Sequence, residues 1–162
     1  MRQDYPADLR GLLAEQLGQP AHHFIVNPEK IGFEAEMLVS QLFKSVPGWE
    51  LKVWETPVGS SADKHSIDLF VYEQSFGIMF VVSVKAICCS RPRYSDRLPS
   101  LDTKTLRRLG AIGISVVRLI VVINCEDYDI SVQQWTNLRK EFVQYMLDEA
   151  CDGGEVVFTV PV

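Results

Sequence analysis

Hydrophobic and polar positions divide the chain into strand-like and helix-like segments. Between residues 66 and 87, two apolar runs rich in β-branched and aromatic residues flank a polar turn at 73–77, which predicts a hairpin of two buried strands. Residues 116–124 are apolar at almost every position, which predicts a central strand covered on both faces. Residues 49–56 alternate between apolar and polar side chains, which predicts a strand with one face in water.

Apolar side chains at a spacing of three and four residues predict helices. Such stripes, with turn or capping residues at their ends, indicate helices at residues 5–17, 28–46, 102–112 and 131–149. We expect Leu106 to face inward in the third helix and Val132 in the fourth. Segments 57–65 and 88–99 are rich in small, polar or basic residues and are expected to be loops, and a last strand is expected at 156–160.

The order of these elements predicts an α/β protein. Two helices precede three strands, and a helix, a strand, a helix and a strand follow. A three-strand meander is antiparallel, whereas helical crossovers join parallel strands, so we expect a mixed β-sheet flanked by helices. One domain is assigned to residues 28–162, and residues 1–27 are expected to form an N-terminal helix and a linker arm.

Composition is that of an ordinary globular protein. The chain is 47% hydrophobic and 23% charged, and its longest uncharged apolar stretch, 109–117, is far too short to cross a membrane. The first residues lack the apolar core of a signal peptide, and the four cysteines lack paired CxxC spacing. We therefore expect a cytoplasmic protein with reduced cysteines and no membrane partner.

Charge is unevenly distributed along the chain. The net charge of −5 argues against non-specific binding of nucleic acid, but residues 88–110 carry six Lys or Arg side chains against two Asp. These cations are candidate nucleic-acid-binding residues, with an ordinary charged loop and helix face as the alternative: Arg91, Arg93, Arg97, Lys104, Arg107 and Arg108. Residues 126–155 carry eight acids against two bases, which would suit a basic protein partner.

Polar side chains interrupt the predicted hairpin at one end only. Asp68 lies at the start of its first strand, and Ser83 and Lys85 lie near the end of its second. The two ends are neighbours because a hairpin doubles back, and residues two apart on a strand share a face. An acid, a hydroxyl and an amine are therefore expected to converge, with a structural ion pair between Asp68 and Lys85 as the plain alternative.

Three short motifs occur in order along residues 30–124. Glu36 follows Ala35 on a predicted helix, residues 66–71 read Ser-Ile-Asp-Leu-Phe-Val, and residues 82–85 read Val-Ser-Val-Lys. In this order, and with these elements between them, the motifs resemble those of the PD-(D/E)xK nuclease superfamily. The resemblance is to its restriction-endonuclease-like and archaeal Holliday-junction-resolvase-like branch.

The resemblance implies a restriction-endonuclease-like fold and a nuclease that hydrolyses phosphodiester bonds in DNA. Glu36 and Asp68 match the family's ligands for Mg²⁺ or Mn²⁺, and Lys85 matches its catalytic lysine. Ser83 departs from the pattern, because the family usually has Asp or Glu there. A neutral hydroxyl is a weaker ligand for a hard cation, so weaker metal binding and reduced or lost cleavage are expected. Resolvase-like relatives pair, which is compatible with a homodimer.

Two further interpretations of the sequence stay open. The neutral Ser83 and the negative net charge of the chain also fit a catalytically inactive nuclease fold that binds nucleic acid or a protein partner. A third interpretation is a partner-binding subunit that uses the acidic 126–155 segment and the N-terminal arm. His65, three residues before Asp68, is more often a solvated loop residue than a ligand or base.

Overall fold

A computed structural model describes residues 7–18, 33–57, 59–87, 98–124, 130–148 and 154–159. The described helices are α1 (Ala7–Leu17), α2 (Phe33–Lys44), α3 (Ser61–Lys64), α4 (Thr103–Ala111) and α5 (Val132–Asp148). The described strands are β1 (Leu51–Glu55), β2 (Leu69–Glu73), β3 (Ile78–Ile87), β4 (Ser115–Asn124) and β5 (Gly154–Thr159). The order agrees with the sequence prediction except at α3, which occupies a segment expected to be a loop.

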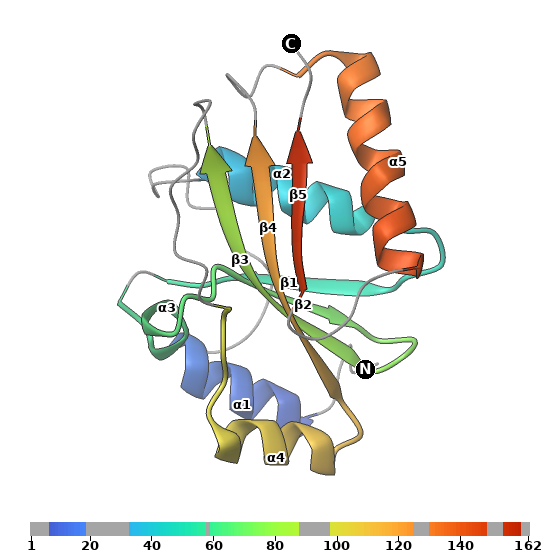
Figure 1. Cartoon of the computed structure of the whole chain (residues 1–162). Helices are drawn as coiled ribbons and strands as arrows, with labels where there is room; N and C mark the ends of the chain where they lie inside the picture. The colour runs from blue at the N-terminus through green and yellow to red at the C-terminus, as the bar shows by residue number, and fades with distance from the viewer. Residues whose placement is uncertain are drawn as a thin grey trace.

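A single mixed sheet holds these strands in the order β1-β2-β3-β4-β5. β2 is antiparallel to β1 and to β3, whereas β4 is parallel to β3 and to β5, which confirms the predicted mixed sheet. The pairing of β3 with β4 runs without interruption from Ile78 opposite Ser115 to Ile87 opposite Asn124. In Figure 1, β3, β4 and β5 run side by side toward one end of the molecule, while β1 and β2 cross below.

Helices cover both faces of the sheet (Figure 1). On one face, Phe43 of α2 packs against Phe80 of β3 and Phe142 of α5, with ring centroids 5.3 and 5.0 Å apart. On the other face, the apolar residues of α1, α3 and α4 share a cluster with Phe70 and Val81. β4 contributes buried residues to both sides, Leu119, Val121 and Ile123 to one and Ile120 and Val122 to the other, so the prediction that it is covered on both faces is confirmed.

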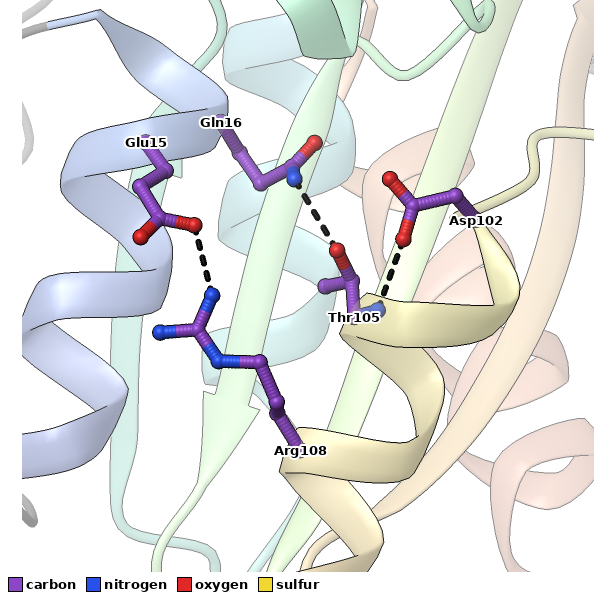
Figure 2. A network of polar contacts seen from close by, with 5 residues as sticks. All are labelled: Glu15, Gln16, Asp102, Thr105 and Arg108. Carbon is purple, nitrogen blue, oxygen red and sulfur yellow. Dashed lines mark hydrogen bonds and ion pairs between the residues drawn. The ribbon is translucent and has the colours of Figure 1, made fainter.

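The first helix belongs to this second apolar layer. Its leucines at 9, 12, 13 and 17 are all buried against the sheet and α4. Gln16 Nε2 donates to Thr105 Oγ1 at 3.2 Å within the contact, and Arg108 Nη1 bonds Glu15 Oε2 at 2.7 Å at its surface, as Figure 2 shows. α1 is thus held to α4 by apolar packing, a buried hydrogen bond and a surface ion pair.

The turn between β2 and β3 is organised by one buried carboxylate. Glu73 is fully buried, and its oxygens accept the backbone N–H groups of Glu50, Ser75 and Phe76 at 3.0, 3.0 and 2.7 Å. Burial alone would raise the pKa of Glu73, but the backbone hydrogen bonds outweigh it, so this pKa lies below its ordinary value of 4.5. Gly77 follows with a φ of 64°, which a residue with a side chain rarely adopts.

Three expectations about the orientation of side chains are wrong. Leu106 is exposed, because α4 turns Thr105 and Leu109 toward the sheet instead. Val132 is exposed at the first position of α5, before the helix reaches the sheet. β1 does not have a wet face along its length, since α2 covers Val53 on one side and α1 covers Trp54 on the other.

Several sequence predictions fall outside the described residues. They concern the linker at 19–27, the four cysteines, most of the loop expected at 88–99 and the acidic residues at 126–129. Among the helices that the structure describes, none combines the length and the apolar character needed to cross a membrane.

Candidate functional site

The chain reaches the candidate site through a tight turn after α3. Ser66 N–H donates to the Asp63 carbonyl and Ile67 N–H donates to the Ala62 carbonyl, both at 3.1 Å. This is the paired hydrogen-bond pattern of a Schellman motif, with Ser66 at its left-handed position and a φ of 65°. Ala62 and Ile67 are fully buried together, so the turn is anchored in the core immediately before Asp68.

Asp68 lies alongside β3, just beyond Leu69, where the pairing of β2 with β3 ends. Its N–H donates to the Val82 carbonyl at 2.8 Å, and its Oδ2 accepts the Val84 N–H at 2.7 Å. The carboxylate thus takes the place that a backbone carbonyl of a neighbouring strand would occupy. Since the Val84 nitrogen belongs to the peptide that follows Ser83, the hairpin brings Asp68 to the segment Ser83–Lys85.

Ser83 and Lys85 lie on the same face of the sheet but differ in accessibility. The Ser83 side chain is fully buried, and within the described part of the chain its Oγ has no hydrogen-bond partner. Lys85 is half-buried and forms no ion pair with any residue that the structure describes. The Lys85 side chain is therefore not held in place by an ion pair with Asp68.

Glu36 approaches this region from the opposite side of the sheet. It is almost fully buried in the first turn of α2, which packs against the face of β3 that carries Val82. Ser83 and Lys85 alternate with that residue and share the face of Val81, which packs with α1. The structure brings Asp68 to the Ser83–Lys85 segment, whereas α2, which carries Glu36, packs on the other face of the sheet.

The acidic side chains determine which cation the site could hold. No group of three or more His, Cys, Asp or Glu side chains within the described ranges is close enough to hold a metal ion. Asp68 supplies one carboxylate at the strand edge, and Ser83 is neutral and enclosed. Mg²⁺ often uses one or two protein carboxylates together with substrate phosphates, so the residues fit a cation that Asp68 and a phosphate would share.

The candidate nucleic-acid-binding residues are divided between two regions. Arg91, Arg93 and Arg97 lie outside the described residues, so their positions stay predictions. Lys104 and Arg107 are exposed on α4, which ends where β4 begins. Because Ile78 pairs with Ser115 there, a rise of about 3.3 Å per residue puts Lys85 roughly 23 Å along β3 from the end of α4. The start of α4, which carries Lys104, lies instead beside His65.

Arg108 has a structural contact of its own. Its guanidinium pairs with Glu15 across the surface between α1 and α4 (Figure 2). A nucleic acid that used Arg108 would have to compete with this ion pair.

His65 lies beside the start of α4. Its carbonyl accepts the Ser100 N–H at 3.4 Å, and Asp102 caps α4 by accepting the Thr105 N–H at 2.7 Å. That backbone bond is the main cause that lowers the pKa of Asp102, and the nearby His65 lowers it further. His65 is therefore placed toward the α4 cap.

Three features of the site had no clear sequence signal. The Val84 N–H is a backbone group, and only the end of the β2 pairing leaves it available to Asp68. Ser66 occupies a position for which glycine is the usual signal, so the sequence does not indicate its left-handed turn. The buried hydroxyls of Thr56 and Ser83 on either side of Asp68 were likewise visible only in the strand register.

Comparison with known protein families, with curated proteins and with solved structures finds no match to this chain. The mixed α/β sheet is established by the strand pairing, and the chemistry of the site must be argued from its residues.

Proposed function

We propose that this protein is a nuclease-like domain of restriction-endonuclease-like fold that acts on phosphodiester bonds in DNA. The observation that carries the proposal is the hydrogen bond from Val84 N–H to Asp68 Oδ2. It holds an acid against β3, where the next side chain after Ser83 on the same face is the half-buried amine of Lys85. The order of helix, meander, crossover helix and parallel strand supports the same assignment.

The side chains at this strand end suit a phosphodiester group. The Lys85 ammonium would offset the negative charge that builds up on the phosphate oxygens as a water oxygen attacks phosphorus. In this hydrolysis the water oxygen forms a new bond to phosphorus and one P–O ester bond breaks. The proton that the water loses is balanced by the proton that the leaving oxygen gains to become the hydroxyl product. Asp68 would orient that water or bind a cation through its carboxylate.

A divalent cation, Mg²⁺ or Mn²⁺, would supply further charge stabilisation when it is bound. Asp68 is the residue that would hold it, with the substrate phosphate as an additional ligand. Glu36 is proposed as a second ligand because its motif resembles that of the family. For this role, the cation would have to reach the buried Glu36 carboxylate around the edge of β3.

The test is cleavage of supercoiled plasmid and of single-stranded DNA in Mg²⁺ and in Mn²⁺. Asp68→Asn and Lys85→Gln are the decisive variants, and Lys52→Gln on β1 serves as a matched lysine control. We expect the wild type and Lys52→Gln to cut and the two site variants to lose at least tenfold in rate. Equal cutting by all four proteins would identify a contaminating nuclease and refute the assignment.

A second candidate function is a catalytically inactive nuclease fold that binds nucleic acid. The burial of Ser83 favours it, because the position that the family pattern gives to an acidic ligand is here neutral and closed to solvent. The packing of α2, which carries Glu36, on the face of the sheet opposite Val81 supports the same function.

Binding and cleavage measured together separate the two functions. An inactive module would bind fluorescein-labelled DNA with an affinity that falls as salt rises, and would cut nothing in either metal. A protein that neither binds nor cuts would contradict both functions and favour a subunit that binds other proteins.

A further inference from the structure

Ser66 has a backbone conformation that its side chain disfavours. Among the described residues it is the only one other than glycine with a positive φ, 65°. The left-handed region is costly for residues with a Cβ, and the same position in a Schellman motif is most often glycine. The hydrogen bonds of the turn come from backbone groups, so a glycine would form them equally well.

The hydroxyl of Ser66 has no structural task in the part of the chain that the structure describes. It makes no hydrogen bond there, and the residue is half-buried, so its oxygen is not enclosed in the core. Ser83, by contrast, is fully buried and closed to any ligand from solvent. Residues with strained backbones cluster at active sites and at ligand contacts.

Ser66 lies beside the proposed site. It is two residues before Asp68, whose carboxylate is fixed at the Val84 N–H, and the turn is anchored by buried Ala62 and Ile67. A serine hydroxyl and a lysine ammonium are both hydrogen-bond donors, and together they suit an anionic oxygen.

We propose that the Ser66 hydroxyl donates a hydrogen bond to a phosphate oxygen of the DNA that binds at Asp68 and Lys85. This inference rests on the proposed function, whether or not the protein cuts. Ser66 is then a binding residue, and the strain of its backbone is retained because glycine in its place would lack the donor.

The test compares stability with affinity in the same variants. Ser66→Gly removes both strain and hydroxyl, Ser66→Ala removes the hydroxyl and keeps the strain, and Ser115→Ala, an exposed serine at the start of β4, is the control. Thermal unfolding gives Tm, and fluorescence anisotropy of a labelled DNA duplex in EDTA and in Mg²⁺ gives Kd.

We expect Ser66→Gly to raise Tm by about 2 °C, since relief of strain exceeds the entropy cost of glycine. Both Ser66 variants should weaken DNA binding about tenfold, as loss of a hydrogen bond to a charged group does. Ser115→Ala should change neither quantity.

The outcomes distinguish this inference from the function on which it rests. If the wild type binds DNA and both Ser66 variants bind it equally well, the role of Ser66 is refuted and the proposed function stands. If the wild type and Lys85→Gln bind DNA equally weakly or not at all, the proposed function fails, and the role of Ser66 fails with it.

Discussion

The carboxylate of Asp68 accepts the backbone N–H of Val84 at 2.7 Å, at the point where β3 continues beyond its partner β2. Asp68 therefore has a structural contact as well as its proposed chemical one. A strand edge with an unpaired N–H group is a weakness of a sheet, and here a side chain covers it.

Substitution of Asp68 separates these two tasks. Asp68→Ala leaves the Val84 N–H without its acceptor and should lower the free energy of unfolding by about 1–3 kcal/mol. Asp68→Asn keeps an acceptor oxygen but removes the charge, so it should retain most of the stability and lose cleavage or metal response. Urea unfolding of both variants, beside a binding assay, measures the two effects; equal stability of the two variants would contradict the structural part.

Glu73 should make stability depend on pH. Its pKa is lowered in the folded protein, so its ionised form adds stability above the ordinary value of 4.5, and this stability is lost as pH falls toward and through the lower folded value. Glu73→Gln should be less stable than wild type at pH 7, and the difference should shrink below pH 4.5.

The measurement is urea unfolding at pH 7, 5 and 3.5. Glu141→Gln, at an exposed position on α5, is the matched control and should follow the wild type at each pH. A constant gap between Glu73→Gln and wild type at all three values would show that the charge of Glu73 contributes nothing.

Ser83 should be replaceable by alanine without loss of stability. Its buried Oγ has no hydrogen-bond partner in the described part of the structure, so the folded protein bears the cost of removing it from water. Ser83→Ala should therefore be neutral or more stable by about 1 kcal/mol. A loss of more than about 1 kcal/mol in chemical unfolding would mean that the hydroxyl has a bonded partner, such as a buried water.

The contact between α1 and α4 should be dominated by its buried part. Leu13→Ala is expected to cost about 2–5 kcal/mol, as truncation of a fully buried leucine does. Arg108→Ala removes a surface ion pair and should cost less than about 1 kcal/mol. Equilibrium unfolding of both variants gives the comparison, and a larger effect of Arg108 would contradict the expected order.

Much of the fold could be predicted because the hydrophobic pattern is strong. The hairpin around Asp68, the two-sided strand β4 and the leucine stripe of α1 all follow from the spacing of apolar residues. The errors at Leu106 and Val132 arose because periodicity gives the type of an element but not the rotation of its face or its exact start. The covering of β1 by α1 on one side depended on a docking that residues 5–17 alone do not encode.

Less of the site than of the fold could be predicted from the sequence. Asp68, Ser83 and Lys85 could be grouped because a hairpin fixes which residues are neighbours. The enclosure of Ser83 and the placement of Glu36 across the sheet depend on which helix covers which face. That choice is made by tertiary packing, so the motif order alone could not show it.

The docking of α1 has a consequence for the way the protein is made. Gln16 bonds Thr105, 89 residues later in the chain, and Glu15 bonds Arg108, 93 residues later. At about 5–20 residues per second, a ribosome would need roughly 5–20 s to synthesise the partner surface after α1 has emerged. For that interval the leucines of α1 have no α4 to cover them, so the nascent chain offers chaperones an apolar segment.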